Sequence, residues 1–284
     1  MSTIEPHLIG LVLIAAFTHA SWNALVKTTG DGLCTFATVM GTGAVIYMFV
    51  APFVTLPERE VWGYLAVSTL LHYGYFIFLW YALRHGDLST AYPVARGSAP
   101  IIVGVGATVL AGEVLSTQST IGLAVASSGI CMLALEKGLP KQGHRKPFVL
   151  AFITGLFIAS YTVVDGLGLT IASEPWGYIV WLNILDGAPL LLYVLLTRRQ
   201  LYIEFLRIDG KKAVLGGVLA MIGYFFVLYA LSFGHMAHVS ALRETSVLIA
   251  VILGCFTLHE KFGPIRWVAA IAIVCGVASM HLSG

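Results

Sequence analysis

Long apolar stretches follow one another along almost the whole chain, separated by short polar breaks. A helix needs about 20 apolar residues to cross a bilayer, and ten stretches of about that length are present. We predict transmembrane helices over residues 7–26, 33–54, 61–83, 90–111, 119–135, 148–170, 176–196, 213–233, 239–258 and 265–282. The breaks contain glycine, proline and charged residues, which interrupt helices. The pattern therefore predicts an all-α integral membrane protein with ten transmembrane helices.

One stretch of sequence occurs a second time near the end of the chain. Residues 81–113 and 229–260 share a Tyr-Ala-Leu triplet, a glycine, an arginine, an isoleucine and a final glutamate. Each copy has the same place in a set of five helices, and an odd number of crossings inverts the second set. Inverted repeats are typical of transporters whose substrate site lies between the halves. We therefore expect two inverted five-helix repeats, 1–137 and 148–284, joined by a basic linker at 138–147, around a central cavity.

Composition indicates that the bilayer, rather than water, is the solvent. Of the 284 residues, 58% are apolar and 11% are charged, compared with about 25% charged residues in soluble domains. The net charge of +2 argues against a nucleic-acid partner. The N-terminus has no basic run and no small-residue cleavage site, so we expect a retained first helix rather than a signal peptide. The four cysteines are single and widely spaced, so no disulfide, metal site or cofactor is predicted.

The basic residues indicate an orientation in the membrane. The loops that join helices 1–2, 3–4, 5–6, 7–8 and 9–10 hold 13 of the 16 Lys and Arg residues, when Arg266 in the first turn of the last helix is counted with its loop. The loops and tails on the other side hold Arg59 alone, and Arg96 and Arg243 lie within helices. Because cytoplasmic loops carry the excess of positive charge, we expect both termini on the non-cytoplasmic side.

Polar side chains at membrane depth are costly, so each is a functional candidate. His19, Trp22 and Asn23 share one face of the first helix. They form either a hydrogen-bonded cluster between helices or part of a substrate site. His72 and Tyr73 lie about midway along the third helix. His72 is either a hydrogen-bonded buried residue or the site that couples a proton to transport.

The fourth helix contains an arginine between two prolines. Pro93 and Pro100 interrupt the backbone hydrogen bonds on either side of Arg96, and Tyr92 lies one turn before it. Irregular helix at this depth is tolerated where it lines a cavity or is buried in protein. Arg96 either forms a fixed ion pair with an acidic residue of the second half or holds a substrate carboxylate or phosphoryl group. We favour the substrate role.

The candidates in the second half fall on three helices and are Tyr161, Asp165, Asn183, Asp186, Arg243 and Glu244. Tyr161 and Asp165 share one face of their helix, and Asn183 and Asp186 share one face of theirs. Arg243 and Glu244 are adjacent and point about 100° apart. Asp165, Asp186 and Glu244 are the alternatives for an ion pair with Arg96. We expect Trp176 to be an aromatic wall of the site and treat Glu113 and Glu260 as structural turn residues.

Together these features resemble the EamA branch of the drug/metabolite transporter superfamily over nearly the whole chain. The residues that carry the resemblance are Tyr81-Ala82-Leu83, Pro93, Pro100 and Glu113 in the first copy, and Tyr229-Ala230-Leu231 and Glu260 in the second. The second copy departs from the pattern because 239–258 contains no proline. The resemblance implies a ten-helix basket with a central cavity, and transport of small metabolites, often amino acids, across a bacterial inner membrane, with export favoured.

The predicted function is secondary active transport of a small polar or zwitterionic metabolite by alternating access. Arg96 would hold the substrate anion, and Asp165 or Asp186 an amine. The expected partners are the metabolite, membrane lipid and protons as the coupling ion, while the sequence does not determine the oligomeric state. One alternative is a membrane-embedded enzyme acting on a lipid-linked substrate, but no HExxH, GxSxG or Walker motif is present. A channel would be expected to repeat one charged ring, which the sequence lacks.

Overall fold

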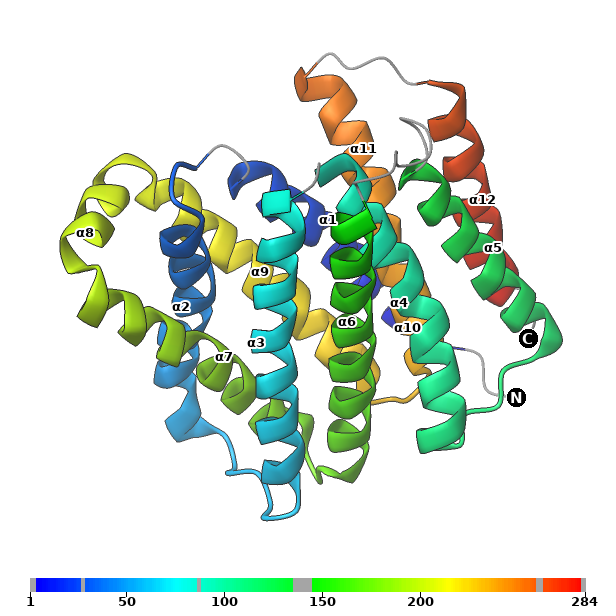
Figure 1. Ribbon diagram of the computed structural model, residues 1–284. Coiled ribbons are helices and arrows are strands. Elements are labelled where there is room, and N and C mark those ends of the chain that lie inside the picture. The colour runs from blue at the N-terminus through cyan, green and yellow to red at the C-terminus, as the bar shows by residue number, and fades with distance from the viewer. Residues whose placement is uncertain (1–3, 27–28, 86–87, 135–144, 259–262, 282–284) are drawn as a thin grey trace.

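The computed structural model describes residues 4–26, 29–85, 88–134, 145–258 and 263–281, with the backbone alone at 80, 83–85, 88–92, 134, 145, 251 and 253–258. Every regular element in this part of the chain is helical (Figure 1), which confirms the predicted all-α class there. The elements are α1 (Pro6–Val26), α2 (Gly32–Val50), the 3-10 turn η1 (Ala51–Phe53), α3 (Val61–His85), α4 (Leu88–Ala111), α5 (Thr117–Ala134), α6 (Arg145–Ile171), α7 (Pro175–Thr197), α8 (Arg199–Ile208), α9 (Gly210–Leu231), α10 (Met236–Arg243), α11 (Thr245–Leu258) and α12 (Pro264–His281).

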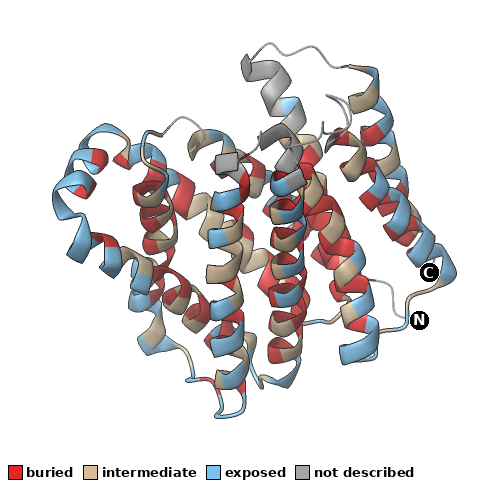
Figure 2. Ribbon diagram, in the orientation of Figure 1, coloured by how far each residue is buried: buried red, intermediate tan, exposed pale blue. Residues whose placement is uncertain are grey.

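Among the described residues, seven helices are long and apolar enough to cross a membrane. They are α1, α2 with η1, α4, α6, α7, α9 and α12. The outward faces of the helices carry exposed residues (Figure 2), including large apolar side chains such as Leu70, which is 70% exposed, and Val109, which is 73% exposed. Exposed apolar surface of this extent suits contact with lipid. The chain is thus a multi-pass membrane protein, and the count of ten spans stays a prediction.

The ninth predicted helix is two helices. The break lies at Glu244, whose backbone N–H bonds to the carbonyl of Ala241, three residues back. Val247 in turn bonds to the Glu244 carbonyl, so the i to i−4 series is interrupted here without a proline. The fourth helix of each half therefore lacks some regular backbone hydrogen bonds. Helix α4 continues through Pro93 and Pro100, which have no N–H to donate, and the turn between α10 and α11 interrupts the other helix.

The structure contains one helix that the apolar pattern did not predict. Helix α8 occupies part of the basic loop after α7, and Tyr202 and Phe205 point from it into the protein. Its apolar residues have helical spacing but alternate with charged ones, so a search for long apolar stretches misses it. Helix α6 also begins at Arg145, which makes the last residues of the predicted linker helical.

The helices pair across the middle of the chain. Helix α1 packs along α9, and α3 packs along α6, while α2 contacts α7 and α5 contacts α12. The first helix of each predicted half therefore lies against the third helix of the other half.

Glycines allow two of these helices to approach closely. A Cβ atom added to Gly276 of α12 would lie 2.5 Å from the carbonyl oxygen of Gly122 and 2.5 Å from the nitrogen of Ala126, both on α5. A Cβ on Gly122 would likewise lie 2.5 Å from the carbonyl oxygen of Gly276. Small residues of this kind let helix backbones pack in lipid, where no hydrophobic force drives them together.

The turn between α9 and α10 is held by a residue from the first half. Gly234 and His235 both have positive φ angles, 83° and 59°. The Glu113 carboxylate then accepts a hydrogen bond from the backbone N–H of Met236 at 2.7 Å. Glu113 thus has a structural role, but it caps α10 rather than the helix that follows it in sequence. Its counterpart, Glu260, lies outside the described residues.

Replacing Gly276 with Ala is expected to destabilise the protein, because the new Cβ meets backbone atoms of α5. Overpacking of this kind costs about 1–3 kcal/mol. The thermal unfolding midpoint of the purified protein should fall. Gly10→Ala in α1 is the matched control, since a Cβ there has nothing within 4 Å. Equal midpoints for the two variants would contradict the close α5–α12 contact.

Candidate functional site

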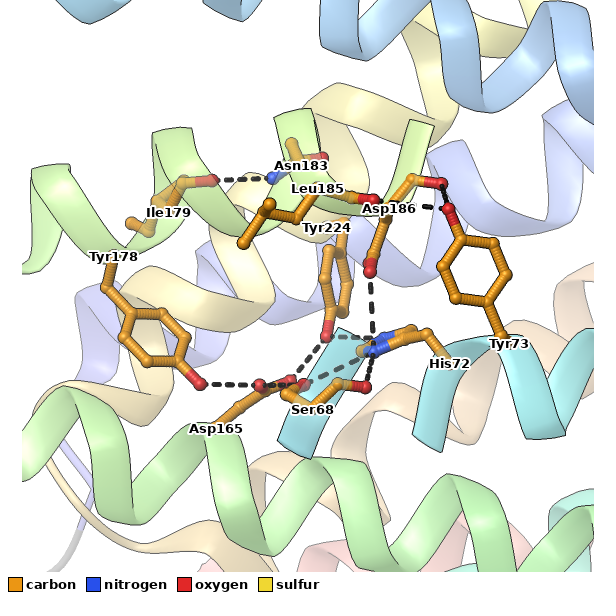
Figure 3. A network of polar contacts seen from close by, with 10 residues as sticks. All are labelled: Ser68, His72, Tyr73, Asp165, Tyr178, Ile179, Asn183, Leu185, Asp186 and Tyr224. Carbon is orange, nitrogen blue, oxygen red and sulfur yellow. Dashed lines mark hydrogen bonds and ion pairs between the residues drawn. The ribbon is translucent and has the colours of Figure 1, made fainter. Parts of the chain in front are cut away.

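A buried carboxylate at the centre of the bundle joins three helices. Asp165 of α6 is 0% exposed and accepts three hydrogen bonds. The donors are the hydroxyls of Ser68 on α3, Tyr178 on α7 at 2.8 Å, and Tyr224 on α9 at 2.6 Å (Figure 3). A charge buried in a bilayer protein is stable only with such partners. Asp165 is therefore held in place by hydrogen bonds from three other helices.

His72 of α3 lies between two carboxylates (Figure 3). Its Nε2 is 3.0 Å from the Tyr224 hydroxyl, which in turn bonds to Asp165. Its Nδ1 is 2.9 Å from the backbone carbonyl of Ser68 and 3.7 Å from the Asp186 carboxylate. The imidazole thus connects the hydrogen bonds around Asp165 to a second acidic residue on α7.

Asp186 has a carboxylate oxygen without an ordinary hydrogen bond. The residue is only 6% exposed and Thr69 lies beside it. Its Oδ1 nevertheless has no hydrogen-bond partner of normal geometry among the described residues. An unpaired carboxylate oxygen in the interior is costly, so this atom is suited to receive a cationic or hydrogen-donating ligand.

A second buried charged cluster contains both arginines that were predicted from the sequence. Arg96 of α4 forms an ion pair with Glu244 at 2.8 Å and a hydrogen bond to Ser246. Arg243 lies 4.0 Å from the same carboxylate, and its Nε and Nη2 have no hydrogen-bond partner among the described residues. The cluster contains two cations and one anion. Arg96 is thus ion-paired with Glu244, and such a pair was the less favoured of its two predicted roles. Its role toward a substrate stays a prediction.

Tyr161 of α6 lies between the acidic and the basic clusters. Its ring stacks on that of His72, with centroids 3.9 Å apart. It also interacts electrostatically with Arg243, Arg96 and Asp165. His19 of α1 likewise lies within range of the two arginine charges. Groups of opposite sign therefore face a common region from different sides.

A cavity of about 100 Å³ occupies this region. Its lining residues are His19, Trp22, Val39, Met40, Gly43, His72, Tyr75, Phe76, Tyr161, Asn183, Asp186, Gly217, Ala220, Met221 and Tyr224. Six of the thirteen predicted site residues are among them. Cavities that bind drug-sized ligands measure about 300–1,000 Å³, so only a very small ligand fits unless the helices move apart.

Other predicted residues lie outside this lining. The Asn23 amide donates to the carbonyl of His19, and the Tyr73 hydroxyl donates to the carbonyls of Leu185 and Asp186. The Tyr92 side chain lies outside the described residues. Asp165, Arg96, Arg243 and Glu244 form the charged surroundings described above.

Trp176, which was expected to be a wall of the site, is not among the residues that line the cavity. Its side chain is 41% exposed and stacks on Phe225 and Tyr229, with ring centroids 6.0 and 5.6 Å apart. It lies at the start of α7, whereas the cavity is lined by residues farther along that helix.

Sequence reasoning missed three hydroxyl groups of the site. Ser68 lies one turn before His72, so its spacing was a usable signal. Tyr178 and Tyr224 had no such signal, because their contacts with Asp165 and His72 arise from packing between helices.

A larger cavity, of about 580 Å³, lies at the ends of α4, α6 and α9. Its lining includes Glu113, His235 and His238 but none of the predicted site residues. Among the described residues no group of His, Cys, Asp or Glu could hold a metal ion. The smaller cavity is the candidate functional site because six of the thirteen predicted site residues line it, including His72 and Asp186.

Comparisons with known proteins agree with the arrangement of helices. Residues 145–281 match the sequence model of the EamA-like transporter family. A protein of known crystal structure superposes with a TM-score of 0.78 over 97% of this chain and 97% of its own length, at 17% identity, which shows a shared fold. No curated protein matches the sequence.

Glu244→Gln is expected to destabilise the protein more than Arg96→Gln does. The first change removes the carboxylate that lies 2.8 Å from Arg96 and 4.0 Å from Arg243, and breaking a buried ion pair costs about 3–5 kcal/mol. After the second change, Glu244 still has Arg243 at 4.0 Å. Thermal unfolding of the two variants measures the difference, and an equal or larger loss in Arg96→Gln would contradict this arrangement of charges.

Proposed function

We propose that this chain, whose residues 145–281 belong to the EamA-like transporter family of the drug/metabolite transporter superfamily, is a secondary active transporter for a small zwitterionic metabolite. Family membership and the apolar helices support a multi-pass membrane transporter. The substrate class comes from the charges around the central cavity.

The observation that carries the proposal is that groups of both charge signs surround Tyr161. The Asp186 carboxylate lines the cavity, and its Oδ1 has no hydrogen-bond partner of normal geometry among the described residues. Within the same part of the chain, Nε and Nη2 of Arg243 have no hydrogen-bond partner, and the Arg243 charge acts on His19 and Tyr161, which both line the cavity. A substrate amine would bind Asp186. A substrate carboxylate would be attracted by Arg243, with Arg96 held by Glu244.

The size of the cavity supports alternating access. A volume of about 100 Å³ is well below the roughly 300–1,000 Å³ of pockets that hold drug-sized ligands. A metabolite of amino-acid size therefore enters only if helices separate on one side. Repeats of this kind move against each other as rigid units. The reciprocal packing of α1 on α9 and α3 on α6 supports two inverted repeats, 1–137 and 148–284.

Orientation and direction of transport follow from the loops and from the family resemblance. The strongly basic loops would face the cytoplasm, which puts both termini on the opposite side of a bacterial inner membrane. Export is the direction that the resemblance favours, with a proton gradient as the source of energy.

The enzyme alternative receives no support from the site. Ser68, His72 and Asp165 are close together, but the Ser68 hydroxyl donates to the carboxylate and the residue is 0% exposed. A nucleophile needs its base to accept its proton and needs access to substrate.

Purified protein in liposomes should exchange labelled amino acids, tested as a panel, by saturable counterflow. Asp186→Asn should weaken this exchange because a charge-assisted hydrogen bond is worth about 1.5–3 kcal/mol, or roughly 10- to 150-fold in affinity. Glu204→Gln, at an exposed position of α8, is the control of the same chemistry.

Unchanged exchange in Asp186→Asn would remove this residue from the site. If no compound in the panel is exchanged and a lipid-linked product forms instead, the carrier proposal fails.

A further inference from the structure

We propose that His72, Tyr224 and Asp165 hold one mobile proton, which passes between the imidazole and the carboxylate through the Tyr224 hydroxyl. The inference deepens the proposed function, on which it rests for calling this proton the coupling ion. The argument comes from counting hydrogen-bond donors and acceptors among the described residues.

All three hydroxyl protons around Asp165 point to its carboxylate. Ser68 and Tyr178 donate to Oδ1, and Tyr224 donates to Oδ2 at 2.6 Å. A serine or tyrosine hydroxyl has a single proton to donate. Ser68 and Tyr224 therefore have only lone pairs to offer to a second neighbour, which in both cases is His72.

Both nitrogens of His72 consequently face acceptors. Nδ1 lies 2.9 Å from the Ser68 carbonyl and 3.2 Å from the Ser68 hydroxyl oxygen. Nε2 lies 3.0 Å from the Tyr224 oxygen. A neutral imidazole has one donor and one acceptor, whereas the imidazolium has two donors. The geometry is therefore satisfied when His72 carries two protons and a positive charge.

The surroundings of the ring suit that charge. Asp165 of α6 and Asp186 of α7 are the acidic groups nearest to it, the latter at 3.7 Å from Nδ1. Tyr161 of α6 stacks on the ring and Tyr224 of α9 meets its edge. Arg96 of α4 and Arg243 of α10 also interact electrostatically with Tyr161. Two carboxylates thus face His72 and its hydroxyl partners.

Transfer of the proton needs no other reactant. The Nε2–H bond breaks as its proton passes to the Tyr224 oxygen, while the original Tyr224 proton passes to Oδ2 of Asp165. The products are a neutral imidazole, a neutral carboxylic acid and an intact tyrosine, and the two hydrogen bonds reverse direction. An ion pair becomes a neutral pair without any heavy atom having to move far.

This transfer changes the contact between the two halves. His72 belongs to α3 in the first half, whereas Asp165 and Tyr224 belong to α6 and α9 in the second. In the charged state, ionic attraction adds to the hydrogen bonds that hold these helices together. Loss of the proton would weaken that link next to the cavity, which relates protonation to separation of the halves.

Nitrogen-15 NMR of the full chain, labelled at histidine and reconstituted in lipid bilayers, tests the proton site. The His72 signal is assigned by its absence in His72→Gln. At neutral pH, we expect both ring nitrogens of His72 to be protonated. Tyr224→Phe removes the acceptor for Nε2–H, so the signal of that proton should be lost. Tyr178→Phe is the matched variant, since it removes a donor to Asp165 that does not contact His72, and it should keep the doubly protonated signal.

A wild-type His72 that carries no second proton at any pH at which the protein is folded would overturn the proposal, as would an unchanged His72 signal in Tyr224→Phe. The counterflow assay separates this inference from the proposed function. A His72 that carries the second proton in a protein that exchanges no metabolite supports the proton site and rejects the carrier. Metabolite exchange with a His72 that never carries a second proton supports the carrier and rejects the shared proton.

Discussion

In an apolar bundle, a buried charge is stable only where other groups surround it with hydrogen bonds or opposite charge. Asp165 meets this requirement with three hydroxyl donors from three helices. The position of each donor then fixes how α3, α7 and α9 lie against α6. The polar network of the site is therefore also a structural constraint, because the same bonds that stabilise Asp165 place His72 and Tyr224 beside the cavity.

The second charged cluster lies where both halves depart from regular helix. Arg96 lies between two prolines in α4, and Glu244 lies at the break between α10 and α11. Their ion pair joins these irregular segments, whose backbones are not fully held by their own helical bonds. The second copy lacks prolines in this region, yet its helix is interrupted at the partner of Arg96. At membrane depth, such irregular segments are tolerated where they are buried within the protein.

The apolar pattern was sufficient to predict where most helices lie, because each span is long enough for composition alone to mark it. It failed for α8, whose apolar residues face the protein on one side of a short charged helix, and for the break at Glu244, which has no proline to signal it. Several site candidates, including His72, Asp165 and Asp186, are close together in the structure. Because ionisable side chains are energetically costly within a membrane, residue type and position in the sequence were enough to single them out.

By itself, the sequence determined the all-helical class, the membrane setting and the set of costly polar groups, since these depend on composition and local spacing. Only the tertiary structure decided which groups are paired. It joined Arg96 to Glu244, brought Tyr224 between His72 and Asp165, and placed Trp176 outside the cavity lining. Among the described residues it also left Oδ1 of Asp186 without a hydrogen-bond partner of normal geometry. These outcomes depend on packing between helices far apart in the chain, for which residue spacing carries no information.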